Sequence, residues 1–526
     1  MLAKVSSATV VGIQAAPIDV EVDFAVGLPG CHIVGLPDAG VKEGRLRIRG
    51  ALENCGFKLP SRRITVNLAP ADLRKDGAAF DLPIAVGMLC AAGVVAPGTI
   101  DDAIFVGELA LDGSARPVRG VLPIADWARR RGRAKRLFVP RDNAPEARVI
   151  SDGCAVFPVS GIPDLLDALR DGVPRSAGQV DQIGDIGDVR SKECLPWGRA
   201  RISSSPAAPD MVDVRGQEVA RRALELAAAG GHNLLFVGPP GSGKTMLAQR
   251  MPGLLPPLGL EEGLGTTMVY SVAGLLGGRS LLRERPFRAP HHTVSVAGLV
   301  GGGPACRPGE VSLAHHGVLF LDELLEFQRP ALEALRQPIE DRVVSVVRAR
   351  RSIEYPADFM LIAALNPCPC GHLGSGLRTC TCSRAGIAAY RARLSGPLLD
   401  RIDMHVEVPA VSYRALSEKA PGEASSDIRA RVVEARERQR RRAGDGPMVL
   451  NARLSGTELD RVAALDQAGH RLLEKAVSRF GLSARAIVRV RRVARTIADL
   501  AGSETVASGH LGEALQYRAL DRPVDG

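Results

Sequence analysis

The stretch NLLFVGPPGSGKTMLAQR, residues 233–250, decides the fold of this chain. Its apolar start is typical of a buried strand, and a glycine-rich turn then leads into residues with helical spacing. The turn GPPGSGKT, residues 238–245, fits the pattern G-x-x-x-x-G-K-[ST]. In that pattern, glycines let backbone N–H groups surround phosphates at the start of a helix. The sequence therefore predicts an α/β unit with a parallel sheet that binds a nucleotide.

The residues of this turn have expected roles in holding a nucleotide and its metal ion. The Lys244 ammonium would meet the β- and γ-phosphate oxygens, and the Thr245 hydroxyl would be a ligand of Mg²⁺. The residues predicted to bind ATP and Mg²⁺ are Gly238, Pro239, Pro240, Gly241, Ser242, Gly243, Lys244, Thr245 and Asp322.

Two further apolar runs end in polar side chains that suit ATP hydrolysis. GVLFLDE, residues 317–323, ends in Asp322 and Glu323, and DFMLIAALN, residues 358–366, ends in Asn366. Asp322 would complete the Mg²⁺ shell, Glu323 would polarise the attacking water, and Asn366 would sense the γ-phosphate or align that water. Strands often end in such residues for turn formation alone. Their combination with the phosphate-binding turn is what favours an ATPase.

Two arginines are candidates for stabilising the transition state. Arg401, in LSGPLLDRIDMHVEV, lies in a turn before a strand, from which an oligomeric ATPase could present a cation to its neighbour's γ-phosphate. Arg485, in LSARAIVRV, starts a predicted helix, and we expect it to contact the nucleotide of its own subunit. A surface arginine is more commonly only a solvated charge.

Length, composition and net charge indicate a globular protein with several domains. With 526 residues the chain should hold three or four folding units, and 45% apolar with 24% charged residues is an ordinary globular composition. The formal charge of +10 weakly favours a polyanionic partner. No apolar run reaches the roughly 18 residues of a membrane span, and the N-terminus alternates like a strand rather than a signal peptide. We expect a cytoplasmic protein without a membrane partner.

Composition divides the chain into four parts. Residues 1–170 alternate short strands and helices, and residues 171–210 are rich in Gly, Pro, Ser and Asp, as linkers are. Residues 211–412 carry the nucleotide-binding patterns. Residues 413–526 have apolar positions at three- and four-residue spacing, which predicts an all-helical lid. Within this lid the run RERQRRR, residues 436–442, is expected to be mainly a solvated face.

The motifs together resemble a known family. FRAPHHT, LVGGG, PGEVSLAHHGVLFLDEL, LNPCPCG and LSGPLLDRID are similar to the YifB/ComM family of magnesium-chelatase-like AAA+ ATPases, and the resemblance covers nearly the whole chain. It implies a Lon-protease-like N-terminal domain of the ribosomal S5 domain 2 type, an AAA+ core and a chelatase-type helical lid. It also implies a homo-hexameric helicase that drives DNA branch migration when transforming DNA is integrated.

The N-terminal domain departs from the protease pattern. Lon-like proteases place the nucleophilic Ser two residues after a Lys-Asp-Gly segment, where RKDGAAFDLPIAVGM has Ala79. The segment expected to hold the general-base Lys, around Leu122 to Ala128, contains no Lys. Without either member of the dyad, we expect a domain for assembly or DNA positioning, inert as a peptidase.

A basic hairpin is the candidate DNA contact. VVSVVRARRSIEYPADF, residues 343–359, reads as two strands joined around Arg348, Arg350 and Arg351. Such a tip is commonly plain solvated surface. In a ring-shaped ATPase, a hairpin before the sensing strand would point into the pore, where cations hold phosphates without reading bases.

The stretch NPCPCGHLGSGLRTCTC, residues 366–382, holds four of the ten cysteines. Cys368, Cys370, Cys380 and Cys382 form two close pairs that could hold a tetrahedral structural Zn²⁺, although Cys-x-Cys is tighter than the usual spacing. Four reduced thiols and a redox switch are the alternatives. The paired histidines in RAPHHTVS and LAHHG lack a third ligand and are expected in packing or in a DNA-facing loop.

These observations favour an ATP-driven motor that acts on single-stranded or branched DNA, with ATP and Mg²⁺ as cofactors. A subunit that uses ATP to insert a metal into a tetrapyrrole is one alternative, and a scaffold that binds protein through the Lon-like domain is another. The response of ATP turnover to DNA separates the three.

Overall fold

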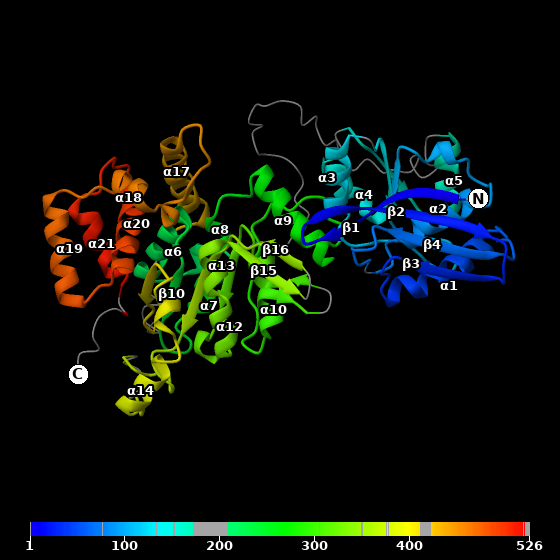
Figure 1. Ribbon diagram of the computed structural model, residues 1–526. Coiled ribbons are helices and arrows are strands. Elements are labelled where there is room, and N and C mark those ends of the chain that lie inside the picture. The colour runs from blue at the N-terminus through cyan, green and yellow to red at the C-terminus, as the bar shows by residue number, and fades with distance from the viewer. Residues whose placement is uncertain are drawn as a thin grey trace.

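The structure is a computed structural model that describes residues 2–75, 77–132, 134–150, 153–171, 209–303, 306–348, 351–374, 376, 378–410, 422–518 and 520. Most of the expected linker, residues 171–210, therefore lies outside the described residues. The described chain is elongated, with an N-terminal domain at one end, helices of the C-terminal part at the other and a central core between them (Figure 1). None of the described helices is long and apolar enough to cross a membrane.

The N-terminal domain is built on a mixed seven-stranded sheet with the order β3-β4-β2-β1-β5-β8-β9. The alternating N-terminus forms a long antiparallel hairpin of β1 with β2, as its period-two pattern predicts. The strands of the sheet are β1 (Leu2–Val11), β2 (Gln14–Ala25), β3 (Gly30–Val34), β4 (Arg63–Ala69), β5 (Ala103–Phe105), β8 (Arg136–Pro140) and β9 (Ala155–Val159), beside the short pair β6 (Glu108–Leu109) and β7 (Ala115–Arg116). The helices are α1 (Ala39–Asn54), α2 (Asp81–Ala91), α3 (Val121–Arg131), α4 (Ala144–Ala147) and α5 (Ile162–Asp171).

The core contains a five-stranded sheet in the order β11-β14-β17-β10-β18, and every neighbouring pair is parallel. Its strands are β10 (Leu234–Val237), β11 (Phe287–Arg288), β14 (Val318–Leu321), β17 (Met360–Leu365) and β18 (Met404–Glu407). The central strands β10, β14 and β17 are buried throughout, which explains their continuous apolar runs. Because parallel strands end at one edge, the polar residues that follow these three strands meet there.

Helices and a hairpin surround this sheet. The helices of the core are α6 (Glu218–Gly230), α7 (Lys244–Gln249), α8 (Met251–Leu254), α9 (Leu260–Ala273), α10 (Val296–Val300), α11 (Glu310–Leu313), α12 (Arg329–Ala334), α13 (Arg336–Asp341), α14 (Arg384–Arg391) and α15 (Gly396–Leu399). The predicted hairpin is confirmed as β15 (Val343–Arg348) paired with β16 (Arg351–Pro356). A short pair, β12 (Gly301–Gly302) with β13 (Arg307–Pro308), precedes α11.

The described part of residues 413–526 is helical, as its periodicity predicts. It contains α17 (Ser425–Ala443), α18 (Gly456–Val462), α19 (Gln467–Phe480), α20 (Ala484–Leu500) and α21 (Ser508–Gln516). Their apolar faces share one core cluster with α6 and the inner strands, including Val432, Val493 and Leu511. These helices therefore pack directly on the core that contains the five-stranded sheet.

The expectation that residues 436–442 are mainly solvated is partly wrong. Arg436 donates two hydrogen bonds to the Ala228 carbonyl of α6, and burial lowers the pKa of Arg436 to about 9. Arg442 pairs with the buried Asp499 of α20 at 2.5 Å. Only part of the run, including Arg440 and Arg441, is exposed. Helical spacing could not reveal this, because the partners come from distant segments.

The N-terminal domain contacts the core at α9. The Ser271 hydroxyl of α9 donates to the Glu146 carboxylate at 2.6 Å, and the backbone N–H of Gly120 donates to the Ser271 carbonyl at 3.0 Å. Burial raises the pKa of Glu146, and the hydrogen bonds from Ser271 and Asn143 oppose that shift. Ile13, in the β1–β2 turn, packs on the apolar cluster that contains Val269 and Tyr270 of α9.

Candidate active site

The phosphate-binding turn follows β10 and leads into α7, as the sequence predicts. A Cβ atom at Gly238 would lie only 2.2 Å from the Val408 carbonyl oxygen, so only glycine fits at the start of the turn. The turn opens onto a cavity of about 390 Å³. That cavity is lined by Pro240, Gly241, Ser242, Gly243, Lys244, Thr245, Met246, Asp322, Glu323, Leu365 and Asn366.

Lys244 lies at the centre of this cavity and is only 8% exposed. Its ammonium donates to the carbonyls of Gly238 at 2.7 Å and Pro239 at 2.9 Å, and to the Asn366 side-chain oxygen at 3.3 Å. Burial lowers the pKa of Lys244, and the negative charges of Asp322 and Glu323 oppose that shift. The structure thus brings the lysine and the predicted sensing asparagine into direct contact, where both can reach one phosphate group.

The residues predicted to hold Mg²⁺ also meet. The Thr245 hydroxyl donates to the Asp322 carboxylate at 2.6 Å, and the backbone N–H of Glu323 donates to the other Asp322 oxygen at 2.9 Å. A hydroxyl and a carboxylate beside a phosphate site are suitable oxygen ligands for Mg²⁺. The donor set therefore fits the metal as well as the nucleotide.

His292 is a neighbour of this site that the sequence did not identify. Its ring nitrogen lies 3.6 Å from the Glu323 carboxylate. The ring also lies tilted against His291 at a centroid distance of 4.1 Å and packs edge to face with Phe327. The available signal was the motif FRAPHHT, which begins with β11 and places His292 just after it, because β11 pairs with β14, the strand that precedes Glu323.

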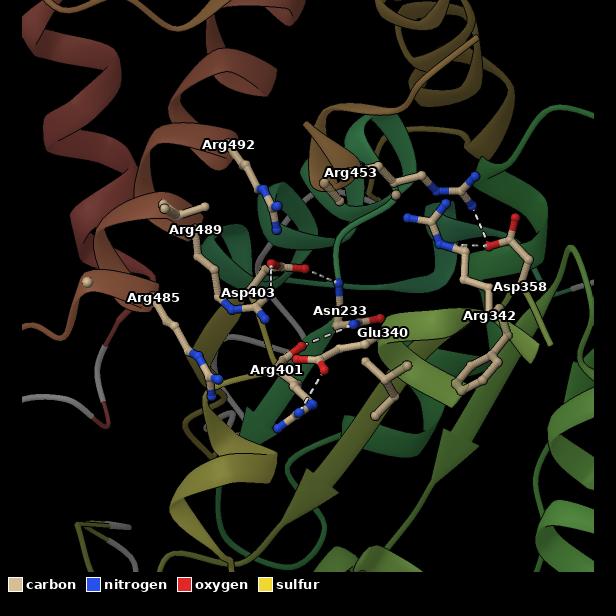
Figure 2. A pocket seen from close by; sticks show the side chains of 16 residues that line it. Asn233, Glu340, Arg342, Asp358, Arg401, Asp403, Arg453, Arg485, Arg489 and Arg492 are labelled. Atoms are coloured by element: carbon tan, nitrogen blue, oxygen red, sulfur yellow. Dashed lines mark hydrogen bonds and ion pairs between the residues drawn. The ribbon is translucent and has the colours of Figure 1, made fainter. Parts of the chain in front are cut away.

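A second cavity, of about 480 Å³, lies between the core and the C-terminal helices (Figure 2). Six arginines line it: Arg342, Arg401, Arg453, Arg485, Arg489 and Arg492. Three carboxylates offset part of that charge. Arg453 pairs with Asp358, Arg489 pairs with Asp403 at 2.5 Å, and Arg401 pairs with Glu340 at 2.8 Å. Although burial alone would raise it, the pKa of Asp403 is far below its usual range because of Arg489 and His232.

The two candidate arginines lie together in this second cavity. Arg401 also donates to the Pro397 carbonyl at 2.7 Å, and its side chain is 12% exposed. Figure 2 shows Arg485 beside it, with its guanidinium on the same side of the cavity. Arg485 is 61% exposed and lies 3.8 Å from Asp400. No residue lines both cavities, so Arg485 does not belong to the lining of the first cavity.

The backbone of the hairpin is described up to Arg348 on one strand and from Arg351 on the other. Arg348 and Arg351 are paired across the last rung of the β15–β16 ladder, and Arg350 lies outside the described residues. The turn at Gly12 of the N-terminal domain lies against Ile353 and Glu354 of β16. On its other side, the hairpin meets β12, where Gly302 lies beside Val346. The hairpin is therefore supported from two sides.

The four clustered cysteines converge after β17. Their Sγ atoms all lie within 4.8 Å of one another, and this is the single cluster of potential metal ligands within the described residues. Cys368 is buried and the other three are partly exposed. The arrangement is compatible with a bound zinc ion.

Ala79, at the position of the protease nucleophile, belongs to an apolar cluster. The cluster also contains Val121 and Ala125 of α3, the helix expected to carry the base. Lys75, before this position, is buried and donates to the Gly35 carbonyl at 2.9 Å. These described residues provide no hydroxyl nucleophile at Ala79.

Comparison with known proteins gives consistent matches along the chain. Residues 210–416 match the family described as Magnesium chelatase, subunit ChlI, residues 20–143 match Subunit ChlI of Mg-chelatase, and residues 422–518 match Magnesium chelatase, subunit ChlI C-terminal. The chain is 44% identical to the protein YifB of Salmonella typhimurium over 525 residues, which cover 99% of this chain and 98% of that protein.

Two further relatives are informative. The chain is 43% identical to Competence protein ComM of Haemophilus influenzae over 529 residues, again 99% of this chain and 98% of the relative. It is 33% identical to the Archaeal Lon protease of Halobacterium salinarum over 125 residues, which cover 20% of this chain and 17% of that protease.

Proposed function

This chain belongs to the YifB/ComM family of magnesium-chelatase-like AAA+ ATPases, and from that premise we propose that it is an ATP-driven motor acting on DNA. The observation that carries the DNA assignment is the full-length identity of 43% to a protein named for competence. We propose further that the substrate is single-stranded or branched DNA and that the motor promotes branch migration as a hexamer. The basic tip of the β15–β16 hairpin supports a DNA contact of the backbone-binding kind.

The proposed division of labour at the ATP site follows from the geometry of the first cavity. Lys244 and Asn366 would hold the γ-phosphate, while Thr245 and Asp322 would hold Mg²⁺, which when bound offsets negative charge on the phosphates. Glu323, the neighbouring carboxylate, would accept a proton from the attacking water. Each of these roles is a proposal supported by position.

We propose that Arg401 and Arg485 complete the site of a neighbouring subunit. Both line the second cavity, and Arg401 is held by Glu340 rather than by any residue of the first cavity. A cationic cavity with two arginines directed to one side could receive the γ-phosphate end of another subunit's nucleotide. The four cysteines would bind one structural zinc ion in each chain.

The test is ATP turnover and strand separation by the purified protein. We expect forked or single-stranded DNA to stimulate ATP hydrolysis and expect forked substrates to be unwound. Lys244→Ala should abolish both while leaving DNA binding largely intact. ATP turnover that ignores every DNA tested would contradict the motor assignment and favour a chelatase-type subunit, the activity named by the matching families.

A further inference from the structure

The four-cysteine cluster has the dimensions of a tetrahedral metal site. The Sγ atom of Cys368 lies 3.4 Å from that of Cys370 and 3.7 Å from that of Cys380, and the Cys370 and Cys380 sulfurs are 3.6 Å apart. Four thiolates bound to Zn²⁺ at about 2.3 Å would be roughly 3.8 Å apart. The separations far exceed a disulfide bond, so the cluster consists of free thiols held at metal-binding distances.

Two backbone N–H groups are directed at sulfur atoms of the cluster. The N–H of Leu373 points to the Cys368 sulfur at 3.4 Å, and the N–H of Cys370 points to the Cys382 sulfur at 3.4 Å. In these positions the two N–H groups would offset part of the negative charge of cysteine sulfurs bound to a cation. Cysteine ligands without carboxylates or water favour zinc over Mg²⁺ or Ca²⁺.

The cluster lies against the nucleotide site. Cys368 follows the sensing residue Asn366 by two positions, and Gly371 closes the first cysteine turn at a φ of 79°. A Cβ atom on Gly371 would lie 2.6 Å from the Pro240 ring and 3.9 Å from the Asn366 side chain. Pro240 and Asn366 both line the first cavity. The cysteine turn therefore packs directly against the phosphate-binding turn.

We infer that the four cysteines bind one zinc ion. The turn at residues 368–371, fixed by this ion, holds Pro240 and Asn366 in position, so that ATP turnover depends on zinc. The ion would link residues 368–370 to residues 380–382 and close the loop between them, which restricts the chain beside the sensor. This inference rests on the proposed ATPase function but does not require DNA as the substrate.

The first experiment measures zinc and turnover together. Full-length protein purified without added metal should contain about one zinc per chain by elemental analysis. Cys380→Ser and Cys382→Ser should lose most of that zinc and lower basal ATP turnover at least fivefold. Cys31→Ser, a partly buried thiol of the N-terminal domain, is the matched control and should retain both. Circular dichroism and oligomer size establish that each variant is folded.

The second experiment separates metal binding from its effect on the ATP site. Gly371→Ala keeps all four ligands, so zinc should remain at about one per chain while the apparent KM for ATP rises or turnover falls at least threefold. Gly374→Ala is the control, since Gly374 has a similar φ of 71° but a Cβ atom there would meet nothing within 4 Å. Equal behaviour of these two variants would overturn the contact with Pro240.

Other outcomes are also decisive. Wild-type protein without zinc, or zinc-free Cys382→Ser that hydrolyses ATP at the normal rate, would overturn the inference. Zinc-dependent basal turnover in a protein that ignores DNA would support it while contradicting the proposed motor. The zinc assay therefore tests this inference, and the DNA assay tests the proposed motor function separately.

Discussion

At the scale of single residues, Glu323 combines an unusual backbone with an unexpected partner. Its φ of 50° is in the left-handed region, which a side chain other than glycine rarely adopts. Such strain persists where the surroundings impose it and is common at functional sites. Its carboxylate is more than half exposed and faces His292. The histidine therefore contributes to the orientation of the proposed water-activating group.

Replacement of His292 tests this contact. A partly exposed contact between an imidazole and a carboxylate contributes at most about 0.5–1 kcal/mol, so His292→Ala should lower kcat for ATP roughly two- to fivefold. The KM for ATP should stay constant, because His292 does not line the nucleotide cavity. His291→Ala is the control, since His291 contacts the Thr293 hydroxyl at 2.9 Å instead. Steady-state kinetics in which both variants behave alike, or in which only KM changes, would contradict the assignment.

His315 gives a prediction about pH. Burial is the largest cause that lowers the pKa of His315 to about 3, with a further contribution from His316, while Asp358 and Glu262 oppose the shift and Arg453 adds to it. The neutral ring accepts a hydrogen bond from the Asp358 N–H at 3.1 Å. The folded state disfavours protonation of His315 relative to the unfolded state. The contribution of this histidine to the free energy of unfolding is therefore complete above pH 6.5 and is lost as pH falls toward 3.

The wild-type melting temperature should therefore fall as pH is lowered from about 6.5 toward 5, and His315→Gln should reduce that dependence. Thermal unfolding of both proteins across this range measures the slope. The variant is expected to be less stable at every pH, so the slope and not the absolute temperature is the readout. Parallel curves would show that His315 does not control this transition.

Local sequence patterns predicted which side chains would meet at the end of the parallel sheet, but they could not predict the partners from distant segments. Lys244, Thr245, Asp322 and Asn366 were predictable, because the turn motif and the ends of parallel strands impose their convergence. The Arg401–Glu340 pair depends on how separate elements pack, and no spacing in the sequence encodes it. The position of Arg485 in the second cavity depends on the same packing.

At the scale of elements, the β15–β16 hairpin links the proposed DNA contact to the rest of the molecule. It meets the N-terminal domain at Gly12 and the β12 strand at Gly302. The chain between β11 and β12 carries His292 near its start and α10 at its end. A displacement of the hairpin tip could thus be transmitted through β12 and α10 to the surroundings of Glu323.

Removal of the hairpin charges tests the DNA contact. Arg348, Arg350 and Arg351 replaced together by Ala should weaken binding of all DNA sequences alike, because phosphate contacts carry no base information. The slope of log affinity against log salt should flatten by up to about 0.7 per lost contact on single strands. Basal ATP turnover should persist, while DNA stimulation and unwinding should fall together.

A double replacement of Arg440 and Arg441 by Ala is the control, since both are exposed on α17. It removes charge without altering the hairpin and should change DNA binding and the salt slope little. A triple hairpin variant that unwinds forked DNA at the wild-type rate would contradict the proposed contact. Equal losses in both variants would indicate a general charge effect instead.

At the scale of the whole molecule, the two cavities lie on separate parts of the protomer. The first holds the proposed phosphate, metal and water-activating groups, and the second holds the proposed arginines with an excess of positive charge. The excess is explained if the second cavity faces the anionic nucleotide of another subunit. A catalytic site shared in this way makes turnover depend on assembly.

Mixing of variants tests this sharing. Arg401→Ala should retain ATP binding but lose hydrolysis, and Glu323→Gln should do the same for a different reason. In a mixed assembly, some sites would combine intact Glu323 of one subunit with intact Arg401 of the next. Turnover should therefore reappear on mixing and should vary with the ratio of the two proteins in a coupled ATPase assay.

A mixture of Lys244→Ala with Glu323→Gln is the matched control, because both changes affect the first cavity and leave no intact one in any subunit. That mixture should stay inactive at every ratio. If the Arg401→Ala mixture also stays inactive while size measurements show mixed assemblies, the two residues do not act across one interface. Normal turnover by Arg401→Ala alone would exclude a required role, and the charge of the second cavity would then need a different ligand.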